Sequence, residues 1–149
     1  MFVVDTNILI YAADRHCQEH DHCRHLVESW RHQPTPWYLT WNIVYEFLRV
    51  STHPRVFRNP WKLAEAWAFV ESILSVDSVG VLTATPKHIE FVTRTVGEVG
   101  GLFGNVLHDT HTAVLMREHG IRRIYTRDTD FHRFPFLEVI DPLTSSGDS

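Results

Sequence analysis

The spacing of hydrophobic and polar positions changes repeatedly along the chain, which predicts alternating strands and helices. Short apolar runs containing β-branched residues predict strands at residues 2–4, 37–39, 79–82, 123–126 and 137–140. Apolar residues spaced three or four apart, with capping and terminating residues, predict helices at 8–13, 18–32, 41–52, 61–74, 86–99 and 105–119. Strands that alternate with helices favour right-handed crossovers. We therefore expect an α/β fold, a three-layer α/β/α sandwich with a mostly parallel sheet.

Length and composition favour one ordinary globular domain. With 149 residues, 44% of them hydrophobic, the chain is long enough to enclose a single core, and we expect a domain over residues 1–143 followed by a disordered tail at 144–149. The sequence contains no apolar stretch of about 18 residues and no secretory leader pattern, so we expect no membrane association and a cytoplasmic location. The two cysteines are too few for a disulfide framework.

Four acidic residues occupy positions that this pattern assigns to strand ends or to apolar helix faces. Asp5 closes the first strand and Asp128 follows the strand at 123–126, so both are expected at the carboxyl edge of the sheet, where α/β proteins place their sites. Glu46 and Asp109 share helical stripes with apolar residues three and four positions away, so we expect both side chains to point inward.

Converging carboxylates favour a bound cation, because burial of an unpaired ionised carboxylate costs several kcal/mol. Hard divalent cations such as Mg²⁺ prefer oxygen ligands of this kind. Such a centre supports hydrolysis of phosphodiester bonds, in which the metal polarises the phosphoryl oxygen and activates water. The four acids Asp5, Glu46, Asp109 and Asp128 therefore predict the metal-binding and catalytic centre of a nuclease.

The motifs that carry these acids resemble those of the PIN-domain ribonucleases, and among them the VapC toxins of toxin-antitoxin modules. The resemblance lies in the opening Val3–Tyr11, the segment Tyr45–Leu48, the helix of Asp109 and the segment Tyr125–Phe131. It implies a PIN-like fold and a metal-dependent endoribonuclease in which Asp5, Glu46, Asp109 and Asp128 hold Mg²⁺ or Mn²⁺.

The resemblance also implies roles for neighbouring residues. Asn7 would orient Asp5 or a metal-bound water, and Thr126 would do the same for Asp128. Two roles for Asp130 remain alternatives: a further metal contact, or a structural cap of the turn that ends in Phe131. The implied partners are an RNA substrate, a small VapB-like antitoxin whose tail enters the acidic groove, and a second copy in a homodimer.

Several other features have competing interpretations. Arg49, Arg55 and Arg127 are candidates for holding RNA phosphates, although a solvated or antitoxin-bound surface is an equal alternative. The histidines and cysteines of residues 16–25 match no paired zinc signature, so a solvated helix face is favoured. Four aromatic residues are expected to pack or to fill an interface rather than to stack on bases: Trp37, Trp41, Phe57 and Trp61.

Three other function classes fit the acids less well. A phosphatase with an Asp nucleophile needs a second acid two residues after Asp5, where this chain has Asn7. A receiver-like signalling module needs adjacent acids after the first strand and a late lysine, but Lys62 and Lys87 are the only lysines. A PIN-like module that binds RNA or a protein partner without turnover would not need to keep all four acids.

Overall fold

The computed structural model describes residues 1–144 and contains one five-stranded sheet. All neighbouring strands run parallel, and their order across the sheet is β3-β2-β1-β4-β5. The strands are β1 (Phe2–Val4), β2 (Trp37–Thr40), β3 (Val79–Leu82), β4 (Arg123–Tyr125) and β5 (Glu138–Ile140). The predicted α/β fold is confirmed. The predicted tail, apart from Thr144, lies outside the described residues.

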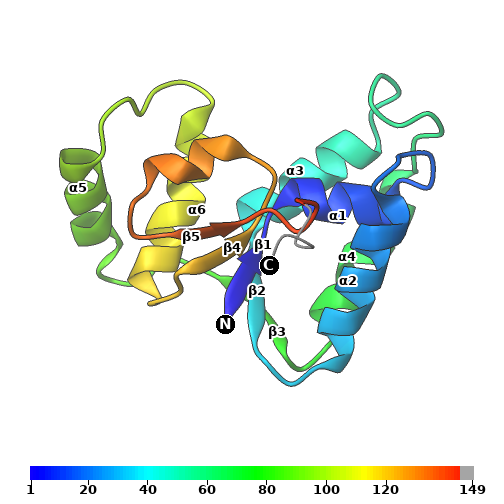
Figure 1. Cartoon of the computed structure of the whole chain (residues 1–149), viewed down its shortest axis with the longest axis horizontal. Coiled ribbons are helices and arrows are strands. Elements are labelled where there is room, and N and C mark those ends of the chain that lie inside the picture. Colours follow the sequence, from blue (N-terminus) through cyan, green and yellow to red (C-terminus); the bar gives the residue numbers. More distant parts are fainter. Residues whose placement is uncertain (145–149) are drawn as a thin grey trace.

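Six helices cover the sheet in two layers (Figure 1). In Figure 1, α1, α2 and α4 lie to the right of the sheet, α5 lies at the far left, and α6 overlaps β4 and β5. The helices are α1 (Thr6–Ala13), α2 (His20–His32), α3 (Trp41–Ser51), α4 (Leu63–Leu74), α5 (His88–Glu98) and α6 (Val106–Glu118). A short 3₁₀ helix, η1 (Thr129–Arg133), joins β4 to β5. No helix within residues 1–144 is long and apolar enough to span a membrane.

The strand order reverses direction between β1 and β4. The chain builds outward from β1 through β2 to β3, and then returns to place β4 on the other side of β1. Because parallel crossovers are right-handed, this reversal puts α5 and α6 on the face opposite α1 to α4. The two layers separate beyond the carboxyl ends of β1 and β4, which is where open α/β sheets hold their ligands.

Some helix boundaries differ from the prediction. Helix α1 begins two residues earlier than expected, because the Asp5 carboxylate accepts the Thr6 N–H at 2.8 Å and caps it. Helix α5 begins at His88, two residues later than expected. The Thr85 hydroxyl accepts the Lys87 N–H at 3.2 Å and forms a turn before the helix, while the Thr85 N–H is held by the Glu118 carboxylate.

The buried face of α3 anchors the layer of α1 to α4. Phe47 is completely buried, and its ring stacks on Phe69 with a centroid distance of 5.1 Å. Trp61 contacts the Phe47 ring edge-on, with a centroid distance of 6.3 Å. These contacts connect α3 with α4 and with the loop between them, and so fix the helix that carries Glu46.

We predict that Phe47→Ala lowers the free energy of unfolding by about 3–5 kcal/mol, because it removes a buried ring and leaves a cavity. Tyr45→Ala, on the exposed side of the same helix, should change it by no more than about 0.5 kcal/mol. Urea unfolding of both variants measures the difference. Equal destabilisation by the two substitutions would contradict this account of α3.

Candidate metal centre

A cleft of about 980 Å³ opens beyond the carboxyl ends of β1 and β4, and acidic side chains are prominent among the residues that line it. Its walls come from α1, α3, α6 and η1. All four acids singled out in the sequence line it, together with a fifth: Asp5, Glu46, Asp109, Asp128 and Asp130. Residues far apart in the sequence therefore meet in one place because the strand order reverses there.

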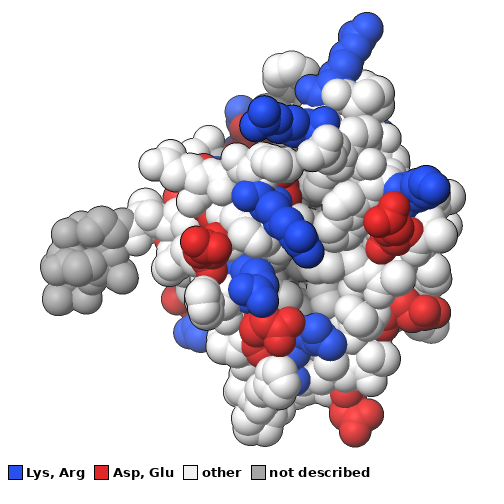
Figure 2. All heavy atoms as spheres, turned by 90° about the vertical axis from the view of Figure 1, so that its right-hand side faces the viewer, with Lys and Arg blue, Asp and Glu red and all other residues white. Residues whose placement is uncertain are grey.

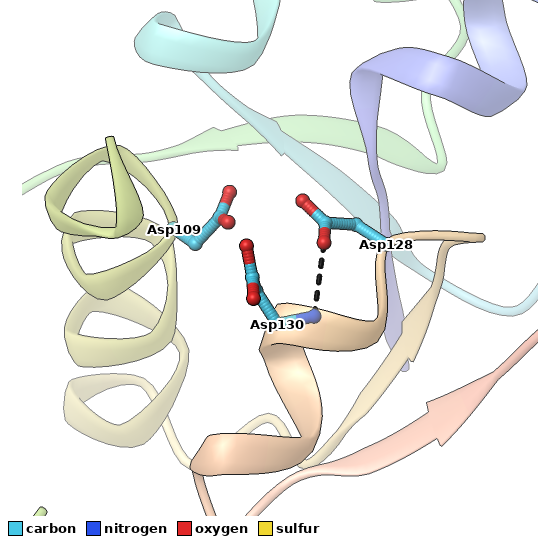
Figure 3. Close-up of side chains that lie close together, drawn as sticks. All are labelled: Asp109, Asp128 and Asp130. Carbon is cyan, nitrogen blue, oxygen red and sulfur yellow. Dashed lines mark hydrogen bonds between the residues drawn. The ribbon is translucent and has the colours of Figure 1, made fainter. Parts of the chain in front are cut away.

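Three of these acids form a tight group (Figure 3). One carboxylate oxygen from each of Asp109, Asp128 and Asp130 lies within 4.8 Å of the other two. Asp109 extends from α6, whereas Asp128 caps η1 by accepting the Asp130 N–H at 2.9 Å. Asp130 belongs to the group even though Arg133 also lies 3.5 Å from its carboxylate.

Asp5 lies deeper, with 8% of its surface exposed, and its carboxylate is held by three donors. One oxygen accepts the Thr6 N–H. The other accepts the Thr126 hydroxyl at 2.7 Å and the Asn7 amide at 3.3 Å. These bonds fix the direction of the carboxylate, as expected of a group that must hold a ligand.

Thr126 orients a different acid from the one expected. Its hydroxyl donates to Asp5 rather than to the Asp128 side chain, and its oxygen accepts the Asp128 N–H at 2.9 Å. The side-chain amide nitrogen of Asn7 also donates to this hydroxyl oxygen, at 3.1 Å. The side-chain oxygen of Asn7 accepts the backbone N–H of Arg127 at 3.2 Å. Thr126 and Asn7 thus join the ends of β1 and β4.

The prediction that Glu46 points into the interior is wrong. Its side chain is 46% exposed and forms an ion pair with Arg49 at 2.6 Å. Its stripe neighbours Ile43 and Val50 both line the cleft. That stripe is therefore the border between the buried face of α3 and the cleft wall, which is why apolar spacing alone suggested burial.

Burial and mutual repulsion raise the pKa values of two of the acids. Burial is the largest cause for Asp5, with Asp128 and Glu46 adding to it, so that its pKa rises to about 6 despite the hydrogen bonds that oppose the rise. Burial also leads for Asp109, followed by the charges of Asp128 and Asp5, and raises its pKa to about 8. Asp109 therefore retains its proton near neutral pH unless a cation neutralises the site.

The donor set fits a hard divalent cation. Carboxylate oxygens at this mutual distance can share one ion, and the open side of the cleft leaves room for water and for a phosphate. The residues 16–25 offer no comparable group within residues 1–144. Their histidines bond to separate partners, such as Asn59 for His16 and the Tyr11 carbonyl for His20.

The three candidate RNA-binding arginines have different positions. Arg49 lines the cleft. Arg55 is exposed on the loop after α3, and Arg127 lies 3.4 Å from Asp141. On the face that carries α2 and α4, basic side chains are interleaved with acidic ones (Figure 2), so this face does not form a continuous basic surface. Phosphate binding by Arg55 and Arg127 stays a prediction.

Three of the four aromatic residues considered in the sequence pack in or against the core, whereas Trp41 is 43% exposed. Trp37 and Phe57 are buried, and Trp61 contacts the rings of Phe47 and Phe69. The cleft instead exposes Tyr45, which sequence analysis did not select. The signal was present, since Tyr45 precedes Glu46 and lies about 100° around the helix from it, further from the buried face.

An all-parallel α/β sheet with converging carboxylates at its switch point is the arrangement expected of a metal-dependent nuclease. The chain belongs to the PIN domain family, which it matches over residues 2–137. Its curated relatives from Mycobacterium tuberculosis include ribonuclease VapC48, 30% identical over 94% of this chain and 96% of the relative. Ribonuclease VapC33 is 32% identical over 96% of this chain and 99% of the relative.

Solved structures share the fold across almost the whole chain. VapC20 of Mycobacterium tuberculosis, described as a toxin that cleaves the sarcin-ricin loop, has a TM-score of 0.63 at 20% identity and covers 95% of this chain and 100% of its own. FitAcB of Neisseria gonorrhoeae has a TM-score of 0.63 at 18% identity and covers 95% of this chain and 98% of its own. The resemblance noted in the motifs is confirmed. The phosphatase and receiver-like interpretations gain no support from these comparisons.

The raised pKa values predict that the metal-free protein loses stability as the pH rises. A carboxyl group whose pKa is raised by folding stabilises the fold fully below its ordinary value of 3.8. That contribution disappears through about pH 6 for Asp5 and about pH 8 for Asp109. Thermal unfolding in a chelator should therefore show a falling melting temperature across this range, and Mg²⁺ or Mn²⁺ should reverse the fall.

Asp109→Asn should remove the upper part of this pH dependence, because the variant carries no charge at that position. Asp77→Asn, on the exposed turn before β3, is the matched control and should behave as the unsubstituted chain. If Asp109→Asn and the unsubstituted chain lost stability equally between about pH 7 and about pH 9, Asp109 would not carry the raised pKa.

Proposed function

We propose that this chain is a metal-dependent endoribonuclease that acts as the toxin of a VapBC-type toxin-antitoxin module. The observation that carries the proposal is the convergence of five carboxylates in one cleft of a PIN-family chain. The ribonuclease names of relatives that align over nearly their whole length support the reaction class. The nuclease domain is taken as residues 1–143.

In this proposal, Asp5, Glu46, Asp109 and Asp128 hold Mg²⁺ or Mn²⁺, and Asp130 supplies a further oxygen. A bound divalent cation would polarise the phosphoryl oxygen and lower the pKa of water. The carboxylates would hold water and phosphate in line within the cleft. Asn7 and Thr126 would keep Asp5 directed at the site, because both side chains donate to the same oxygen of the Asp5 carboxylate.

Arg49 connects metal binding with substrate binding. It pairs with Glu46 on the wall of the cleft, where an incoming phosphate would compete for the guanidinium. Transfer of Arg49 to the phosphate would release the Glu46 carboxylate toward the centre. Arg55 and Arg127 would contact more distant parts of the RNA backbone without selecting its sequence.

The proposed partners follow from the relatives and from the charge of the cleft. Two of the similar structures, VapBC2 of Rickettsia felis and FitAcB, support an antitoxin partner by analogy. A small VapB-like antitoxin would place a basic side chain among the carboxylates and so prevent metal and RNA from binding. We place the module, with a homodimeric toxin, in the cytoplasm.

We predict that Asp109→Asn reduces metal-dependent RNA cleavage by more than about 100-fold, because loss of a ligand should exceed the 10- to 100-fold effect of groups behind the ligands. Labelled RNA incubated with Mg²⁺ or Mn²⁺ measures the rate. Asp77→Asn should cleave normally. Cleavage by pure Asp109→Asn at the normal rate would falsify the assignment of this acid.

We predict that Thr126→Val weakens metal binding by about 10- to 100-fold, because it removes the hydroxyl that donates to Asp5 while keeping the side-chain volume. Thr126→Ser retains the hydroxyl and should bind the metal nearly as well as the unsubstituted chain. Titration of Mn²⁺ followed by calorimetry compares the two. Equal affinities for Val and Ser would show that the hydroxyl has no such role.

A further inference from the structure

Tyr45 is an exposed aromatic side chain on the wall of the acidic cleft. It is 68% exposed, although most large rings of the protein are buried in the core or packed against it. Within residues 1–144 its ring stacks on no other aromatic ring and its hydroxyl makes no hydrogen bond. Nothing in the described fold therefore accounts for an aromatic residue at this position.

The neighbours of Tyr45 on α3 are the groups that the reaction needs. Glu46 follows it directly, and Arg49 lies four residues later on the same wall. Side chains four apart on a helix have Cβ atoms about 5–6 Å from each other, close enough for one nucleotide to contact both. The helix thus presents a ring, a cation and a carboxylate to the same nucleotide.

An aromatic ring beside a phosphate-binding cation is the arrangement by which proteins hold single-stranded nucleic acids. Every base has a π-face, so the ring accepts a base without selecting its identity, while the cation tracks the backbone. Bases inside a duplex are already stacked on one another and do not present a free face. A ring at this position therefore favours an unpaired nucleotide.

We propose that Tyr45 stacks on a base next to the scissile phosphate and so positions the RNA strand in the cleft. This inference rests on the proposed ribonuclease function. Tyr45 positions the substrate and takes no part in bond cleavage.

The test measures KM and kcat separately on one RNA. A random single-stranded pool first identifies a sequence that the unsubstituted chain cleaves, and a synthetic oligonucleotide of that sequence is then used alone or annealed to its complement. Loss of one stacking contact is expected to raise KM by roughly 5- to 150-fold for Tyr45→Ala, with a smaller change in kcat. Tyr45→Phe and Tyr45→Trp should keep KM within about threefold.

Two further variants separate stacking from structural effects. Tyr45→Leu keeps an apolar side chain without a ring, so it should resemble Tyr45→Ala in KM while unfolding at the normal temperature. Trp67→Ala removes an aromatic residue of 37% exposure on α4, away from the cleft, and should leave both constants unchanged. The annealed duplex should be cleaved more slowly than the single strand.

The outcomes distinguish this inference from the proposed function. If the unsubstituted chain cleaves RNA and Tyr45→Ala has a normal KM, the stacking role is overturned while the nuclease assignment stands. A normal KM accompanied by dissociation of a dimer, seen by light scattering, would assign Tyr45 to a protein interface instead. If the unsubstituted chain cleaves no RNA with Mg²⁺ or Mn²⁺, both the function and the stacking role fail.

Discussion

The hydrogen bond from the Thr126 hydroxyl to the Asp5 carboxylate holds the functional end of this protein together. It connects the first strand with the fourth across the point where the strand order reverses, at 2.7 Å. Without it, Asp5 would be a buried carboxylate with fewer donors, and the ends of β1 and β4 would lose a short polar link. The same Thr126 oxygen accepts the Asp128 N–H, and the Asp128 carboxylate accepts the Asp130 N–H, so Thr126 also holds the start of the turn that carries these two acids.

The fold tolerates repulsion at this end because its stability comes from elsewhere. The aromatic residues of the α3–α4 layer and the buried strands supply the apolar contacts, whereas the cleft concentrates charge. Such a division is common in proteins that retain a costly polar site for function. The raised pKa values of Asp5 and Asp109 are the electrostatic sign of that cost.

In the proposed function, helix α3 would connect stability with substrate binding. Its inner face packs Phe47, and its outer face presents Tyr45, Glu46 and Arg49 to the cleft. Because the inner face is fixed by interlocking rings, the outer side chains hold their places without contributing much to stability. Metal, phosphate and base would then be recognised from one rigid element, while α6 and η1 supply the opposing carboxylates.

The sequence by itself determined the order of strands and helices and the four acids, since apolar periodicity is a local property and an acid at an apolar position is visible without neighbours. It also placed Asp5 and Asp128 at the carboxyl edge of a parallel sheet. Only the tertiary structure decided that Thr126 serves Asp5, that Asp130 joins Asp109, and that Glu46 and Tyr45 face the cleft. Each of these depends on which surface another element covers, and local spacing contains no information about that partner.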